Sequence, residues 1–124
     1  MIAFALVSTR DRILAIDVGT QGSRAVLHDR QGNEHGFGRR KHAPFLRPAV
    51  GAVLQDPDDI WGAVVHSVRT VMAEHDAARI AAIALTSQRS AVIPVDTEGR
   101  ALHPIVSWLD ARSASEIALL EGIP

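Results

Sequence analysis

The chain has no cysteine among its 124 residues, which excludes a disulfide framework and a thiolate zinc site. It also lacks a surplus of charge of either sign, because 13 Lys and Arg against 14 Asp and Glu give a formal net charge of −1. A net charge this close to zero argues against a general role in binding nucleic acid or a membrane surface. The apolar start of the chain, residues 1–7, is too short to span a bilayer.

Residues 1–7 also lack the basic region and the cleavage site of a signal peptide. We therefore expect a cytoplasmic protein in which these residues form an extra edge strand or a start-site extension. The six histidines include no pair at helical i, i+4 spacing with an acid between them, so no histidine metal site is expected. With 47% apolar residues the composition suits a globular core, and the length allows one domain at most, or part of one.

The most informative segment is Leu14–Leu27, in which two apolar runs flank a tight turn that contains glycine. Glycines allow a positive φ and a close approach of the backbone to a ligand, and successive N–H groups in such a turn bind anions. A hydroxyl can donate to a phosphate oxygen, and a carboxylate can hold Mg²⁺. The pattern predicts a polyphosphate site made of Asp17, Gly19, Thr20, Gln21, Gly22 and Arg24. An ordinary β-hairpin with a glycine turn is the alternative, since short glycine motifs often occur by chance.

The rest of the chain predicts a mixed α/β fold. Alternating or continuous apolar runs predict strands at about residues 13–18, 24–29, 34–42 and 80–85, the last of them buried on both faces. Asp56 as N-cap and Pro57 at the first helical position predict a helix to about His75, with Trp61 in the core. We expect a hairpin from the apolar run 91–95, a short segment at 104–106 and a final helix at about 112–120 that stops at Gly122. The basic run at residues 39–41 indicates a solvated strand edge.

Four blocks in this order resemble the FGGY carbohydrate kinases, the family of glycerol kinase and xylulokinase, over about residues 12–122. The blocks are Ile16–Arg24, Gln55-Asp56-Pro57 with Ile60-Trp61, Ser87-Gln88-Arg89, and Trp108 with Asp110 and Arg112. The resemblance implies the ribonuclease H-like fold of the actin, Hsp70 and hexokinase superfamily, with a mixed sheet and flanking helices. It also implies that residues 1–124 are the N-terminal portion of the family's N-terminal domain, an incomplete lobe, with the general base and the adenine pocket beyond Pro124.

By resemblance, the whole protein would transfer a phosphoryl group from ATP, with Mg²⁺, to a hydroxyl of a small sugar or polyol. Asp17 matches the family aspartate that handles Mg²⁺ and the phosphates, and the turn residues match phosphate contacts. The substrate-binding candidates are Gln88, Arg89, Ser90, Trp108 and Asp110. Arg89 matches an arginine that binds glycerol hydroxyls, and Trp108 an aromatic that covers the carbon side of the substrate. Ser90 stands where glycerol kinase has an acid, so no single substrate is implied.

Two other readings of the sequence remain at this point. One is a non-catalytic, nucleotide-binding member of the actin-like superfamily, and the other is a small structural domain. The polar residues after the strand at 80–85 and around Trp108 argue against the first, because a protein that only binds nucleotide has no need of hydroxyl-binding groups. We expect no nucleic-acid or membrane partner. The 124-residue chain alone should be inactive and prone to form homo-oligomers through exposed apolar surface.

Overall fold

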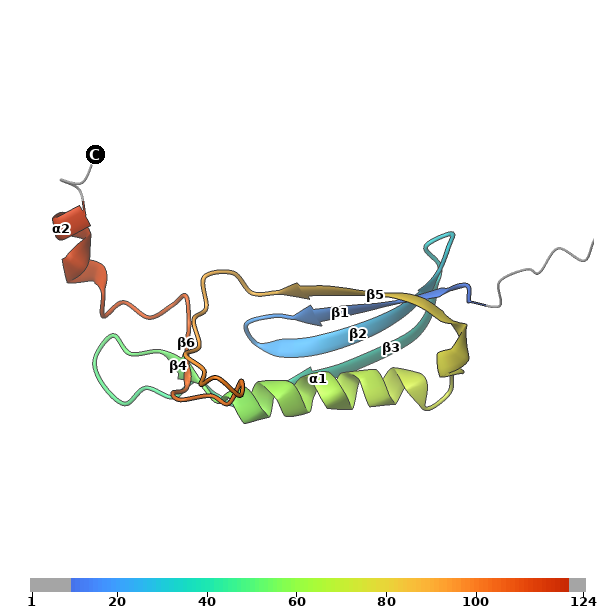
Figure 1. Ribbon diagram of the computed structural model, residues 1–124, viewed down its shortest axis with the longest axis horizontal. Helices are drawn as coiled ribbons and strands as arrows, with labels where there is room; N and C mark the ends of the chain where they lie inside the picture. The colour runs from blue at the N-terminus through green and yellow to red at the C-terminus, as the bar shows by residue number, and fades with distance from the viewer. Residues whose placement is uncertain (1–9, 121–124) are drawn as a thin grey trace, which may run out of the picture.

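A computed structural model describes residues 10–120 and contains a four-stranded mixed sheet (Figure 1). The strands are β1 (Arg12–Val18), β2 (Gly22–Asp29), β3 (Glu34–Lys41) and β5 (Ile80–Ser87), in the order β3-β2-β1-β5. The pairs β1–β2 and β2–β3 are antiparallel, whereas β1 and β5 run parallel. The predicted mixed sheet and its four strands are therefore confirmed, with small shifts of the strand ends.

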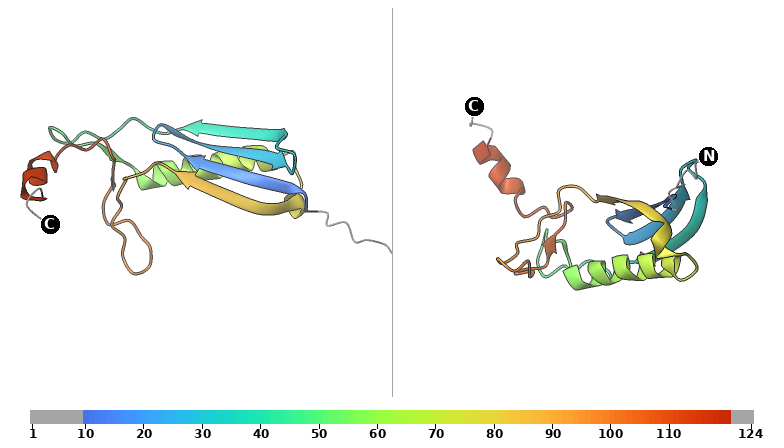
Figure 2. Two further views of the ribbon diagram at one scale, coloured as in Figure 1. Left: turned by 90° about the horizontal axis from the view of Figure 1, so that it is seen from above. Right: turned by 45° about the vertical axis from the view of Figure 1, so that its right-hand side comes forward.

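Helix α1 (Pro57–Met72) covers one face of the sheet (Figure 2). Its start follows the sequence signal: the Asp56 side chain accepts from Asp58 N at 2.9 Å, and Pro57 occupies the first turn, where its missing N–H costs nothing. The helix ends before the predicted His75. Its buried residues pack on the inner face of the sheet, and the core cluster is Leu14, Ala25, Leu27 and Val71.

The helix touches the sheet closely at β3. A Cβ built on Gly38 would lie 2.1 Å from Ser67 O of α1, so only glycine fits at this position. Ser67 itself is fully buried, and its hydroxyl donates to Ser23 O at 3.0 Å and to Ala63 O at 2.8 Å. These contacts hold the helix against the first residues of β2, which is the end of the sheet that carries the glycine turn.

Two sequence predictions about burial are wrong. Trp61 is 67% exposed, because the buried stripe of α1 runs through Ile60 and Ala63 and the Trp61 side chain leaves the helix beside it. Strand β5 is exposed along most of its length, with Ile83 at 64% and Leu85 at 71%. It is an edge strand, and among residues 10–120 only β1 pairs with it, so a continuous apolar run here does not mean burial on both faces.

A second, two-stranded sheet lies beyond the turn end of the large sheet, made of β4 (Leu54–Gln55) and β6 (Ile105–Val106) (Figure 1). The predicted hairpin after residue 90 is reduced to isolated bridges, Val92 with Val106 and Val95 with Ala101. The predicted helix at 112–120 is broken into a 3-10 turn, Ala114–Glu116, and the short α2, Ile117–Leu120, which extends away from the sheet (Figure 1). So short a helix gains little without packing. Residues 1–9 and Gly122 lie outside the described residues.

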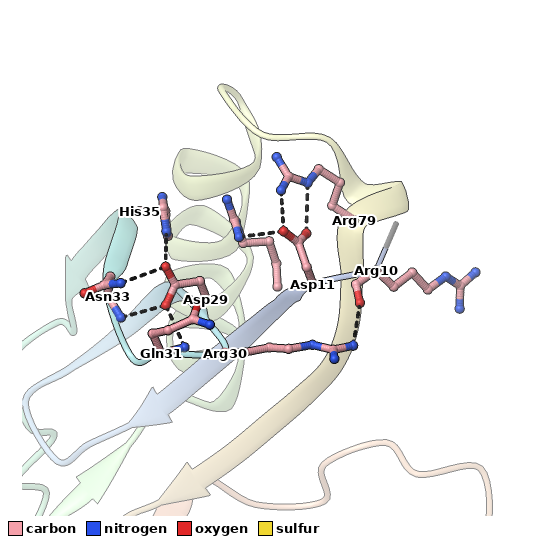
Figure 3. A network of polar contacts seen from close by, with 9 residues as sticks. Arg10, Asp11, Asp29, Arg30, Gln31, Asn33, His35 and Arg79 are labelled. Atoms are coloured by element: carbon pink, nitrogen blue, oxygen red, sulfur yellow. Dashed lines mark hydrogen bonds and ion pairs between the residues drawn. The ribbon is translucent and has the colours of Figure 1, made fainter. Parts of the chain in front are cut away.

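A polar network closes the opposite end of the sheet, where β1 begins and β2 turns into β3 (Figure 3). Asp11 accepts from Arg79, which ends the 3-10 turn Ala77–Arg79 before β5, and from Arg12. Asp29 accepts from the side chains of His35 and Asn33, each at 2.9 Å, and from two backbone amides. Hydrogen bonds from His35 and Asn33 hold the pKa of Asp29 well below its usual range.

No helix of the described residues is long and apolar enough to cross a membrane.

Candidate phosphate and substrate site

The glycine turn joins β1 to β2 in a tight hairpin, closed by a hydrogen bond from Gly19 N to Gly22 O at 3.0 Å. The expectation that these glycines use a positive φ is wrong. The positive-φ glycines of the described residues are Gly32, Gly51 and Gly99. Close approach explains the glycine instead, because a Cβ on Gly22 would lie 2.9 Å from the Arg40 carbonyl oxygen. The backbone of Gly22 therefore packs directly against the backbone of β3.

The structure brings all six predicted turn residues to one pocket of about 360 Å³. Ser23 and Arg39 also line it. Arg24 and Asp17 face each other across β1 and β2, and the Arg24 Nη2 lies 2.7 Å from Asp17 Oδ2. The pocket therefore combines backbone amides, the Thr20 hydroxyl, one carboxylate and two guanidinium groups at the carboxyl end of β1.

Thr20, at the tip of the turn, is held from two directions by residues far away in the sequence. Trp108 Nε1 donates to Thr20 Oγ1 at 3.1 Å, and Gln55 Nε2 donates to Thr20 O at 2.9 Å. Because the hydroxyl oxygen accepts from Trp108, its own proton is free to point elsewhere as a donor. The turn is therefore in direct contact with Trp108, one of the predicted substrate-binding residues.

Gln55 is a site residue that sequence reasoning did not select. It is 4% exposed, and besides binding Thr20 it accepts from Gln88 Nε2 at 2.8 Å. Gln88 in turn donates its backbone N–H to Val18 O at 2.8 Å, at the end of β1. The available signal was an amide directly after the apolar run 52–54, since a buried polar group needs partners. Gln55 thus connects the turn to the end of β5.

The remaining substrate candidates fall into two groups. Ser90, Trp108 and Asp110 line a second pocket of about 470 Å³, and Ser90 has a φ of 59°, which is uncommon for a residue other than glycine. Gln88 is hydrogen-bonded to Gln55 instead. Arg89 is exposed, and its predicted pairing with Trp108 stays a prediction.

Asp110 already has a full set of donors. Its carboxylate accepts from the Arg112 guanidinium and from Val53 N, each at 2.9 Å, and its side chain is 6% exposed. The Arg112 hydrogen bond, followed by that from Val53 N, holds the pKa of Asp110 well below its usual range. In this arrangement Asp110 anchors the loop that carries Trp108 to the segment before Gln55.

The turn offers a single carboxylate for a cation. Among residues 10–120 no cluster of three or more His, Cys, Asp or Glu side chains could hold a metal ion. Mg²⁺ is usually bound through one or two carboxylates together with phosphate oxygens and water. Asp17 is 28% exposed in its side chain and lines the pocket, so it can serve as that carboxylate.

Known proteins resemble the chain over most of its length. It is 43% identical over 112 residues to a glycerol kinase from Chelativorans sp., a match that covers 88% of this chain and 22% of that protein. Among solved structures, a kinase from Brucella ovis described as a xyloylose kinase matches at 32% identity with a TM-score of 0.81, covering 88% of this chain and 23% of the other. A gluconate kinase from Lactobacillus acidophilus matches at 26% identity and a TM-score of 0.79, covering 89% and 22%.

The chain thus spans about a fifth of the length of the relatives it matches. Their folds agree with the mixed sheet described above, which confirms the expected fold class. Residues 12–122 match the N-terminal domain of the FGGY family of carbohydrate kinases. This chain belongs to that family.

Proposed function

We propose that the protein carrying this chain transfers the γ-phosphoryl group of ATP to a hydroxyl of a small sugar or polyol. The observation that carries the proposal is the gathering of all six turn residues around one pocket whose Thr20 is bonded to Trp108. Family membership supports the reaction class, and the named relatives act on glycerol, xyloylose and gluconate. The substrate therefore belongs to the class of small polyhydroxylated molecules.

In this proposal the turn residues bind and orient the phosphates. Apart from the Gly19 amide, which donates to Gly22 O, the amides of the turn and the Thr20 hydroxyl donate to phosphoryl oxygens, and Arg24 neutralises their charge. Asp17 keeps Arg24 in place through the 2.7 Å ion pair, and its carboxylate would be the group that holds Mg²⁺. Mg²⁺, when bound, reduces the negative charge on the transferring group.

The substrate side of the site begins at Trp108. Its indole is 53% exposed although its Nε1 is fixed to Thr20, so an aromatic face is presented next to the phosphate turn. Apolar contact with the carbon side of a polyol, with polar groups around it, suits such a face. Arg89 and Ser90 are the candidates for hydroxyl contacts.

The test is a kinase assay on the full-length protein with ATP, Mg²⁺ and a panel of glycerol, xylulose and gluconate. We expect phosphorylation of at least one of them, and a loss of about 10²–10³ in kcat for Asp17→Ala with an unchanged fold. Glu74→Ala, which removes an exposed carboxylate just after α1, is the matched control. Near-normal turnover of the Asp17→Ala protein would contradict the assignment.

A further inference from the structure

A row of polar side chains crosses the sheet beside the glycine turn. The strand register places Asp17 of β1 opposite Thr86 of β5 and Arg24 of β2, and it places Arg24 opposite Arg39 of β3. Residues directly opposite one another point to the same face of a sheet. The row therefore reads hydroxyl, carboxylate, guanidinium, guanidinium, and Arg39 lines the same pocket as the turn.

This row contains one more positive charge than negative. The carboxylate of Asp17 is paired with Arg24, and among residues 10–120 Arg39 has no ion-pair partner. Like charges directly opposite each other on neighbouring strands are destabilising. An anionic group bound in the pocket would therefore reduce the repulsion between the guanidiniums of Arg24 and Arg39, which both line it.

The neighbouring basic residue shows that the run at 39–41 is not a uniform solvated edge. Arg40 points to the other face of β3, where its Nη2 lies 2.6 Å from Asp59 Oδ1 of α1. Asp59 also accepts from Ala43 N at 2.7 Å. Arg40 is thus used to join strand and helix, whereas Arg39 is exposed at the pocket.

We propose that Arg39 is a further phosphate-binding residue, which grips an oligophosphate chain together with Arg24. The inference rests on the proposed function, because it assigns a ligand contact within the same site. Guanidinium groups bind phosphoryl oxygens through two parallel hydrogen bonds each. Two of them on neighbouring strands, about 5 Å apart at the backbone, match two adjacent phosphoryl groups better than a single one.

The test is a titration of the 124-residue chain with tripolyphosphate and, separately, with orthophosphate, followed by the NMR amide signals of Gly19 and Gly22. Arg39→Ala should raise the Kd for tripolyphosphate about three- to tenfold, the range for losing a charge-assisted contact at an exposed site. Its effect on orthophosphate should be smaller. Arg30→Ala, which removes the same charge at the far end of the sheet, should leave both unchanged.

Thermal unfolding of the free chain distinguishes binding from a structural role. Because Arg39→Ala removes a like-charge pair, the Tm without ligand should stay the same or rise, although binding weakens. A lowered Tm with unchanged affinity would overturn the proposal, as would equal affinities for Arg39→Ala and Arg30→Ala. If the unsubstituted chain shows no tripolyphosphate shift at Gly19 and Gly22, the phosphate role of the turn fails, and this inference with it.

Discussion

Replacing Gln55 by alanine should loosen the glycine turn, although Gln55 lies outside it. The amide of Gln55 is buried and makes two side-chain hydrogen bonds, to Thr20 O at 2.9 Å and from Gln88 Nε2 at 2.8 Å. Gln55→Ala removes the donor to Thr20 O and the acceptor of the Gln88 Nε2 hydrogen bond at once. The Gln88 amide then loses its only acceptor in the described residues, while its own Oε1 is already buried without a partner.

The expected cost follows from these two bonds. A buried polar group left without its partner costs about 1–3 kcal/mol. Thr20 and Gln88 are both half-buried, so water can replace part of the lost bond at Thr20, but the Oε1 of the Gln88 amide is already buried without a partner. We therefore expect Gln55→Ala to lower the free energy of unfolding by about 2–3 kcal/mol, which for a chain of this size lowers the Tm by roughly 10 °C.

The assay combines thermal unfolding with the NMR signals of the tryptophan indole groups. The chain has two tryptophans, so the Trp108 indole reports on the turn through Thr20, and the exposed Trp61 serves as an internal reference. The Trp108 signal should move in Gln55→Ala while that of Trp61 stays in place. Gln31→Ala, an exposed glutamine at the far end of the sheet, should change stability by no more than about 0.5 kcal/mol.

A second variant tests the direction of the hydrogen bond. In Gln55→Glu the ionised carboxylate still accepts from Gln88 but has no proton for Thr20 O. Burial beside a carbonyl oxygen should raise the pKa of this glutamate in the folded state, so its protonated form fits and stability is lost as pH rises. Gln55→Glu should accordingly recover between pH 7 and pH 5. A Tm of Gln55→Ala equal to that of Gln31→Ala would refute the reasoning.

The remaining predictions concern packing, pH and activity. Gly38→Ala should destabilise by about 3 kcal/mol or more in urea unfolding, because its Cβ would lie 2.1 Å from Ser67 O, and a loss below 1 kcal/mol would show that α1 shifts freely. The lowered pKa of Asp29 means that its bonds stabilise the fold above the unfolded pKa of about 3.9 and are lost as pH falls through and below it, so the urea midpoint should drop between pH 5 and pH 3 and less so in Asp29→Asn. The 124-residue chain alone should show no sugar kinase activity and should self-associate in light scattering through Ile83 and Leu85, and robust turnover by the chain alone would contradict this.

Local sequence signals determined much of the architecture. The Asp56-Pro57 start of α1 and the strand–turn–strand at the glycines depend on short-range chemistry, because capping and tight turns involve residues within a few positions of each other. The residues of the phosphate turn could be named for the same reason. They all lie within positions 17–24, so the turn alone brings them to one pocket.

Burial could not be read in the same way. Apolar character indicates that a residue can be buried, but the neighbours that cover it come from other segments. Trp61 lies beside the stripe of α1 that faces the sheet, and β5 lies at the edge of the strand order. Both are therefore exposed in the described residues despite their apolar surroundings in the sequence.

The contacts that turn a glycine hairpin into a site were decided by tertiary structure alone. Thr20 meets Gln55 across 35 positions and Trp108 across 88, and no local pattern specifies such pairs. The register that sets Arg39 opposite Arg24 is likewise fixed by the pairing of β2 with β3, since a slip of one residue would turn Arg39 to the helix face. The sequence alone determined which groups were available for phosphate chemistry, and the packing of strands and loops decided which of them meet.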